Sequence, residues 1–344
     1  MAAMTPAIVL RASGGAGIGI GHLQRCAALA QALKGDVLVS SPERPDVMEE
    51  LGLPAHGRLD DAGWIAALPE GAVVVLDTLH HGNAMATAAD VATLKAAGHR
   101  VVVIDSMPPD HFTAPDPGFL PDLLVTPYHA ADKLRPPLPD TRWLAGSAYA
   151  ILPEAYRHAR AKAAAVTGEG AILVTCGGAD PTGLSLGLAR ACARGVYPVD
   201  VVIGPQFAPD LVADLEALTT TSPQITLHRG LSSLIPLYLR ARLVVGRPGL
   251  VRYEAACLGR RALYLWDHDE YRAYFEAFRD SGLAEIHFTA DPGGKAVFFD
   301  RIATLVTSRE PDLGLVSDAA DAVDGNGAAR VAEAIMAMCQ KGPR

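Results

Sequence analysis

Short apolar runs alternate with stretches of helical periodicity along the chain. In the first half each apolar run is four or five residues long and is bounded by turn-forming residues, the runs being Ala7–Leu10, Asp36–Val39, Ala72–Leu76, Arg100–Ile104 and Leu123–Thr126. Runs of this length without polar alternation predict strands that are buried on both faces, as in a parallel sheet. Between them, Gly21–Leu33 and Ala84–Ala97 have the periodicity of helices.

The second half of the chain repeats this order. Its predicted strands are Ala171–Thr175, Val199–Ile203, Ile225–Leu227, Leu243–Val245 and Arg261–Leu265. Its predicted helices are Leu184–Ala193, Leu211–Leu218, Leu250–Leu258 and Tyr271–Asp280. The turn at Asp324–Gly327 introduces one more helix, whereas Pro108–Pro121 and Pro136–Arg142 predict proline-rich loops.

Repeated strand–helix alternation predicts an α/β fold with doubly wound parallel sheets. A chain of 344 residues also exceeds the size at which one core usually stops growing. We therefore expect two Rossmann-like domains facing a central cleft, at residues 1–154 and 170–325, with a helical linker at 155–169 and a C-terminal helix and tail at 326–344. Ligands of such sheets bind beyond the carboxyl ends of the strands.

Composition narrows the class of protein. The formal net charge of −8 argues against nucleic acid as a partner, because a phosphate backbone requires a basic face. No apolar run approaches the length of about 18 residues that spans a membrane, and the N-terminus lacks the apolar core of a signal peptide, so we expect a cytoplasmic protein. The five cysteines are odd in number and form no CxxC pair, which favours buried free thiols over a zinc site. The oligomeric state is left open.

The first predicted strand runs into a glycine-rich loop, Gly14–Gly21, in which Gly19 and Gly21 allow the backbone to approach a ligand closely. The loop contains no strict GxGxxG, and Asp36 begins the second strand instead of ending it, so a dinucleotide site is disfavoured. His22 follows at the tip of this strand-to-helix turn. A neutral imidazole there can take a proton from water, which makes His22 a candidate general base; the alternative is a hydrogen bond within its own loop.

Two further glycine turns follow strands in the second half. At the first, Gly177 and Gly178 mark a close backbone approach, and Asp180 before Pro181 is typical of a helix N-cap. The second turn predicts a phosphate site with Arg247 as a cationic donor, and its residues are Gly246, Arg247, Gly249, Leu250 and Val251. Glu254, one turn into the next helix, is placed to accept hydrogen bonds from a ribose diol, or else complements the helix dipole.

The segment Trp266–Arg272 follows the next predicted strand and is a candidate sugar-facing loop that includes His268. Asp267, His268 and Asp269 are consecutive and such residues rarely converge on one ion, so we expect no metal site and no cofactor. His80 and His81 are expected in a solvated loop. The sequence contains no GxSxG, P-loop or HExxH motif.

Together these motifs resemble the PseG-like UDP-sugar hydrolases of pseudaminic acid biosynthesis, which share the GT-B fold of the MurG-type glycosyltransferases. The resemblance runs nearly end to end, in order, through Arg11, Gly19–Cys26, Leu29–Ala30, Val73–Asp77, Val103–Asp105, Asp122–Leu124, Gly146, Tyr149–Leu152, Cys176–Pro181, Arg247–Glu254 and Asp324–Arg330. The pair Gly-x-Gly-His-x-x-Arg, ending at Arg25, and Gly-Gly-x-Asp-Pro, beginning at Gly177, is more specific in combination than either motif alone.

The resemblance implies a GT-B-like enzyme that releases UDP from a UDP-linked 2,4-diacetamido-2,4,6-trideoxy sugar. It implies that the reaction needs no metal and inverts the anomeric carbon. It also implies a place in nonulosonic acid synthesis for flagellin glycosylation. It implies that Glu254 contacts the ribose, that Gly249–Val251 lie near the diphosphate and that His22 activates the water. The chain departs from the family at three places. It has Asp77-Thr78-Leu79 where the family has Asp-His-Tyr, and Ser106 where the family has an acidic residue. It has Arg272-Ala273 where the family has an Asn-Gln or Gln-Gln pair. The alternatives are a glycosyltransferase that uses the same donor and a non-catalytic protein that binds nucleotide sugars.

Overall fold

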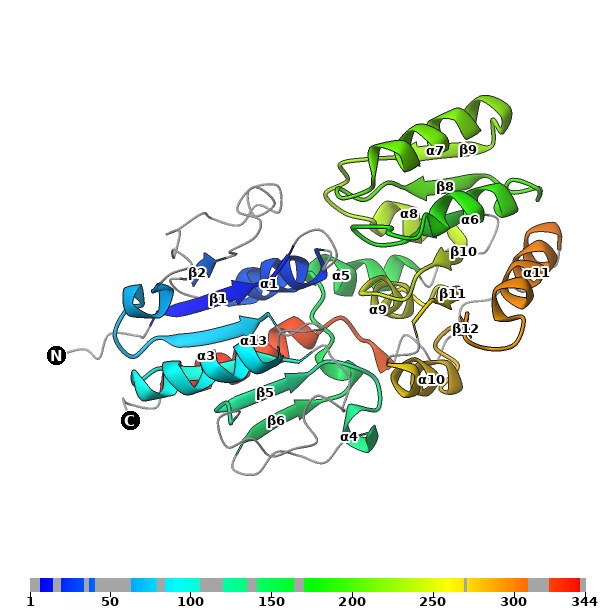
Figure 1. Ribbon diagram of the computed structural model, residues 1–344. Coiled ribbons are helices and arrows are strands. Elements are labelled where there is room, and N and C mark those ends of the chain that lie inside the picture. Colours follow the sequence, from blue (N-terminus) through cyan, green and yellow to red (C-terminus); the bar gives the residue numbers. More distant parts are fainter. Residues whose placement is uncertain are drawn as a thin grey trace. The chain divides into compact units, whose positions relative to one another are not determined.

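The computed structural model describes residues 7–14, 20–33, 37–40, 63–78, 84–105, 120–134, 141–163, 170–268, 271–308 and 322–340. The chain divides into two compact units, which we call unit 1 (residues 1–154 and 325–344) and unit 2 (residues 155–324). Each unit has its own sheet (Figure 1). Buried hydrophobic clusters pack against each sheet.

Unit 1 is built on a six-stranded parallel sheet in the order β2-β1-β3-β4-β5-β6. Its strands are β1 (Ile8–Ala12), β2 (Val37–Ser40), β3 (Val73–Asp77), β4 (Arg100–Ile104), β5 (Leu123–Thr126) and β6 (Arg142–Ala145). The central strands are buried throughout, because helices cover both faces of the sheet.

Two cores hold these helices on unit 1. On one face α1 (Gly21–Ala32) and α13 (Gly327–Cys339) pack on the sheet; on the other lie α3 (Ala84–Ala96) and the short helix η1 (Trp64–Ala67). The short elements α4 (Ala131–Leu134) and η3 (Ser147–Tyr149) follow β5 and β6. Helix α13, red in Figure 1, lies near the C-terminus of the chain but belongs to unit 1. Gly327, its first residue, allows the helix to lie close to Ala150, because a Cβ at this position would be 2.1 Å from the Ala150 carbonyl oxygen.

Unit 2 repeats the architecture with a six-stranded parallel sheet in the order β12-β11-β10-β7-β8-β9. Its strands are β7 (Ala171–Thr175), β8 (Val199–Val202), β9 (Ile225–His228), β10 (Ala241–Gly246), β11 (Ala262–Trp266) and β12 (Glu285–Phe288). Its helices are α5 (Glu154–Ala163), α6 (Leu184–Cys192), α7 (Pro209–Thr221), α8 (Ile235–Arg240), α9 (Val251–Cys257), α10 (Arg272–Asp280) and α11 (Gly294–Thr307). Helices α6, α7 and α11 contribute to the core on one face of the sheet, and on α5 and α8 the rings of Tyr156 and Tyr238 meet edge to face.

The predicted fold class is confirmed, since both halves are parallel α/β sheets. The sequence prediction missed β6 and β12, two of the four edge strands. The first lies where a proline-rich loop was expected to end, and in the second apolar and polar residues alternate. The five cysteines are free and buried, as predicted. Within the described residues, no helix is long and apolar enough to cross a membrane.

Candidate functional site

The carboxyl edge of the unit 1 sheet brings together residues that are distant in sequence. β1 leads through the glycine-rich loop into α1, whose second residue is His22. β3 lies beside β1 with Asp77, its last residue, opposite Ala12. Because both strands end at this edge, the side chain of Asp77 reaches the first turn of α1.

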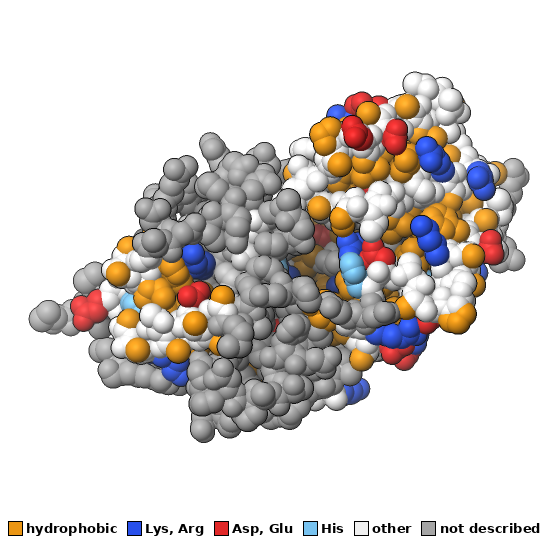
Figure 2. Space-filling view, in the orientation of Figure 1, with side chains coloured by type: hydrophobic (Ala, Val, Ile, Leu, Met, Phe, Trp, Pro, Cys, Tyr) orange, Lys and Arg blue, Asp and Glu red, His pale blue; other side chains and the backbone are white. Residues whose placement is uncertain are grey.

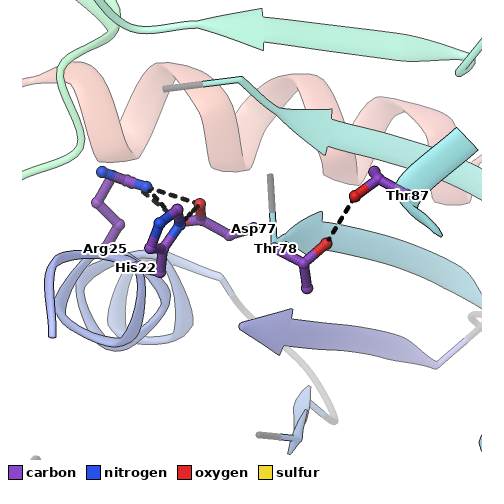
Figure 3. Close-up of polar contacts among 5 residues, drawn as sticks. All are labelled: His22, Arg25, Asp77, Thr78 and Thr87. Carbon is purple, nitrogen blue, oxygen red and sulfur yellow. Dashed lines mark hydrogen bonds and ion pairs between the residues drawn. The ribbon is translucent and has the colours of Figure 1, made fainter. Parts of the chain in front are cut away.

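His22, Arg25 and Asp77 form a buried polar cluster (Figure 3). Nδ1 of His22 lies 2.7 Å from Oδ1 of Asp77. Arg25 binds the same carboxylate through two nitrogens, Nε to Oδ2 at 2.9 Å and Nη2 to Oδ1 at 2.7 Å. Asp77 is 0% exposed, His22 7% and Arg25 9%. A bidentate guanidinium pair of this kind fixes the carboxylate in position and orientation.

The electrostatics of the cluster keep Asp77 ionised. Burial acts to raise its pKa, but the charges of Arg25 and His22, together with the hydrogen bonds from both residues, outweigh burial, so the pKa of Asp77 is lowered below its ordinary value. An ionised, buried carboxylate requires donors on its lone pairs.

The same geometry selects the tautomer of His22. If Nδ1 carried a lone pair, it would face Oδ1 of Asp77 at 2.7 Å with no proton between two acceptors. A proton on Nδ1 removes that repulsion, and Arg25 Nη2, 2.9 Å from Nδ1, directs its hydrogen to Asp77 instead. The lone pair of the imidazole then lies on Nε2, which is the arrangement that a general base requires.

Sequence reasoning predicted two members of this cluster and missed the third. His22 was expected as a base; Arg25 was expected to contact substrate, but in this structure its guanidinium holds Asp77. Asp77 was noted as the end of a stretch that matches a family and as the start of a motif that departs from it, without a role in the site. Its signal was an acidic residue directly after an apolar run.

Two glycines of the loop before His22 were also predicted to lie at the site. A Cβ at Gly21 would have open space within 4 Å, and Gly19 lies outside the described residues.

Unit 2 gathers a second polar cluster at the carboxyl ends of β10 and β11. Nη2 of Arg247 lies 3.0 Å from Oδ1 of Asp267 and 2.7 Å from Nε2 of His268. The guanidinium also lies 5.3 Å from the ring centroid of Trp266. Arg247 and Asp267 are mostly buried, whereas the side chain of His268 is 54% exposed. The cluster therefore offers a cation and an accessible imidazole at the edge where α/β sheets bind ligands.

The glycines beside this cluster differ in whether the surrounding structure leaves room for a side chain. At Gly246 a Cβ would lie 1.7 Å from the carbonyl oxygen of Thr175, so the chains approach too closely for any side chain. Gly177 has a φ of +81°, and the backbone of Gly177 and Gly178 packs against Gly204. Gly249, by contrast, has open space around it.

The N-terminal region of α9 is tied to its surroundings through backbone carbonyls. The carbonyl of Leu250 accepts hydrogen bonds from the amides of Tyr253 and Glu254, and the carbonyl of Val251 accepts one from the Tyr264 hydroxyl at 3.3 Å. Of the segment Gly249–Val251, Val251 is therefore anchored to β11 through the Tyr264 hydroxyl.

Asp180 caps a helix, but not as the sequence pattern suggested. Helix α6 begins at Leu184, so Pro181 is not its first residue. The carboxylate of Asp180 accepts hydrogen bonds from the amides of Leu184, at 3.0 Å, and Ser185, at 2.7 Å. The end of α6 is therefore occupied by a protein carboxylate, and any role of Asp180 toward a ligand stays a prediction.

Glu254 lies in a cluster of tyrosines. It is 7% exposed, and its Oε2 accepts a hydrogen bond of 2.8 Å from the hydroxyl of Tyr238. Tyr156 also hydrogen-bonds this carboxyl group. Burial raises the pKa of Glu254, while the two tyrosine hydrogen bonds oppose that shift. A ribose that bound Glu254 would have to share or replace these hydrogen bonds.

The segment that begins at Arg272 carries ion pairs at the surface. Arg272 binds Glu276 at 2.8 Å and Asp291 at 2.6 Å. On the face drawn in Figure 2, basic and acidic side chains lie side by side over α10, in keeping with these pairs. Tyr271, just before Arg272, has a φ of 73°, a left-handed conformation that is unfavourable for a residue with a side chain.

Neither a protein-family model nor a curated protein matches the sequence. Solved structures do. MurG of Acinetobacter baumannii aligns with a TM-score of 0.60 at 16% identity, covering 97% of this chain and 100% of its own. A putative UDP-N-acetylglucosamine 2-epimerase of Listeria monocytogenes aligns with a TM-score of 0.60 at 14% identity, covering 99% and 98%. MnaA of S. aureus, in a co-structure with UDP, aligns with a TM-score of 0.58 at 13% identity, covering 95% and 94%.

These likenesses show the fold. The chain has the two-domain, Rossmann-like GT-B fold of these neighbours, as the sequence resemblance implied. Membership of the PseG-like family and the roles of individual residues stay predictions.

Proposed function

We propose that the protein is a hydrolase that releases UDP from a UDP-linked amino or deoxy sugar, using a water molecule activated by His22. The observation that carries the proposal is the buried His22–Asp77–Arg25 cluster. From it we infer that the ionised carboxylate favours a proton on Nδ1, so that the neutral imidazole carries its lone pair on Nε2. The fold supports the choice of substrate, because solved neighbours are described as UDP-sugar enzymes or as bound to UDP.

In the proposed reaction the water oxygen forms a bond to the anomeric carbon while the bond from that carbon to the phosphate oxygen breaks. His22 Nε2 takes the proton from the water, and the electron pair of the broken bond leaves with UDP. Attack from the face opposite the leaving group inverts the anomeric carbon. Asp77 stabilises the imidazolium that forms, as the carboxylate of a catalytic triad does, without taking the proton itself.

The proposal assigns the nucleotide to unit 2. Arg247, Asp267 and His268 are polar side chains at the carboxyl ends of β10 and β11. In the proposal Arg247, which is paired with Asp267 here, turns its positive charge toward the leaving diphosphate. The backbone of Gly177, Gly178 and Gly249–Val251 lines the same edge. The contact between Glu254 and the ribose is part of the proposal, with Tyr238 as the group that the ribose would displace.

The test is to incubate the protein with UDP-N-acetyl sugars in the absence of any acceptor and to follow UDP release. Release of UDP with an equal amount of free sugar supports hydrolysis. Release only on addition of an acceptor would replace the proposal with a glycosyltransferase, the activity of another structural neighbour. Conversion of the UDP-sugar to its 2-epimer without loss of UDP would indicate an epimerase, and binding without turnover a binding protein.

A further inference from the structure

Unit 1 carries a second polar pair at the edge of the sheet that bears Asp77. β5 and β6 are adjacent and parallel, with Thr126 opposite Ala145, so the segments that follow them leave at the carboxyl edge. These segments deliver His129 and Ser147, whose Nδ1 and Oγ atoms lie 3.2 Å apart. The strand order β3-β4-β5 places the end of β5 two strands, or about 10 Å, from the end of β3.

Hydrogen bonds to Thr126 fix the residues next to this pair. Trp143 donates a hydrogen bond of 2.6 Å from Nε1 to the hydroxyl of Thr126, which is 0% exposed. Gly146 has a φ of 109°, which only glycine adopts readily, and its amide donates to the Thr126 carbonyl at 3.0 Å. Ser147 is therefore held in place by its turn, and it is 9% exposed.

The residue after His129 is conformationally strained. Ala130 has a φ of 58°, and among the described residues only Ala130 and Tyr271 combine a side chain with a positive φ. Such conformations are unfavourable and gather where function requires them. Tyr271 follows the carboxyl edge of the sheet in unit 2, beside Trp266, so both strained residues lie at edges where ligands of this fold class bind.

The chemistry of the pair suits a neutral, hydroxylated ligand. The pKa of His129 is lowered by burial and by the charge of Lys133, with Asp132 acting in the opposite direction, so the imidazole is neutral at pH 7. A neutral imidazole and a hydroxyl together offer a donor and an acceptor without fixed charge. Sugar hydroxyl and acetamido groups have the same combination.

We propose that His129 and Ser147 form a carbohydrate subsite that hydrogen-bonds a hydroxyl or acetamido substituent of the sugar, away from the anomeric carbon at His22. This inference rests on the proposed function, because it concerns the sugar part of the same substrate. Both residues act in binding and specificity and exchange no proton with the substrate. His22 and His129 then divide the unit 1 edge between chemistry and recognition.

The test compares UDP-N-acetylglucosamine with UDP by calorimetry on the full chain carrying His22→Ala, so that hydrolysis does not contribute to the heat. Ser147→Ala and His129→Gln should each weaken binding of UDP-N-acetylglucosamine about three- to tenfold, the effect of one neutral hydrogen bond, while binding of UDP stays unchanged. In turnover assays, with His22 intact, the same variants should raise KM and leave kcat nearly unchanged. His158→Gln, on an exposed histidine of α5, is the matched control and should change neither ligand.

The outcomes separate this inference from the proposed function. If neither variant alters the ratio of the two affinities, the subsite is wrong even where wild-type protein hydrolyses the sugar. If wild-type protein binds UDP-N-acetylglucosamine without hydrolysing it, the proposed reaction fails and the affinity ratio still decides the subsite. If a variant lost affinity for UDP by the same factor as for UDP-N-acetylglucosamine, the substitution would have disturbed the structure generally, and the inference would be overturned.

Discussion

Replacing Asp77 with Asn removes the charge at the centre of the unit 1 cluster and nearly preserves its shape. The amide cannot accept two hydrogen bonds from Arg25 and one from His22 as the carboxylate does. It no longer selects the Nδ1–H tautomer, so Nε2 is not held as the base. Loss of such an oriented base costs about 10²–10⁴ in kcat. We expect a fall of this size in sugar release, with UDP affinity within a few-fold of wild type because Asp77 lies in unit 1.

The same change should lower stability, because it leaves the buried Arg25 without its counter-charge. Breaking a buried pair in this way costs about 3–5 kcal/mol, or roughly 6–20 °C in Tm for a domain of this size. The pKa of Asp77 is lowered on folding, so its ionised form stabilises the fold above the unfolded pKa of about 4. That contribution is lost as pH falls through the folded pKa. The Tm gap between wild type and variant should shrink as pH falls below about 4.

A matched control exists in unit 2. Asp200 is 2% exposed and carries a histidine and an arginine, with Nε2 of His228 at 2.8 Å and Arg240 on the same oxygen. Asp200→Asn makes the same chemical change away from the proposed sites, so it should lower Tm while keeping kcat within about threefold. If Asp77→Asn lost stability but kept wild-type kcat, Asp77 would not orient the base and the reasoning would be refuted.

Three further outcomes follow from the proposed sites. His22→Ala should lower sugar release by about 10²–10⁴ with UDP affinity within a few-fold of wild type, and wild-type turnover by this variant would remove His22 as base. Arg247→Ala should weaken UDP binding about tenfold or more, whereas Arg229→Ala, at an exposed arginine, should leave UDP binding unchanged. If calorimetry gave the two variants equal affinities for UDP, Arg247 would not belong to the site. The pKa of Glu254 is raised on folding, so its ionisation penalises the fold as pH rises above the unfolded pKa of about 4.3. Glu254→Gln escapes this penalty, so its Tm relative to wild type should rise as pH increases from that value, and a Tm difference independent of pH would contradict the assignment.

Elements with strong local signals were predictable from the sequence. The apolar runs at β4, β5 and β7 were placed at their observed bounds, because strands buried on both faces leave a continuous apolar pattern. The edge strands β6 and β12 leave no such pattern, since one face of each is polar or exposed. His22 was identifiable because the first strand-to-helix turn always lies at the carboxyl edge.

The partners of the site residues could not be predicted from local sequence. Asp77 meets His22 only because the sheet places β3 next to β1, an order that no local pattern encodes. The inward position of Glu254 depends on Tyr156 and Tyr238, which come from two other helices. Both facts belong to tertiary packing.

The central claim is that His22 activates water for attack on a nucleotide sugar. The most direct measurement is proton NMR of a UDP-N-acetyl sugar incubated with the protein, without acceptor and with EDTA present. The account predicts UDP and free sugar in equal amounts, with the first-formed sugar inverted at the anomeric carbon. Persistence of the UDP-sugar, or release that requires an added acceptor or a divalent metal, would contradict it.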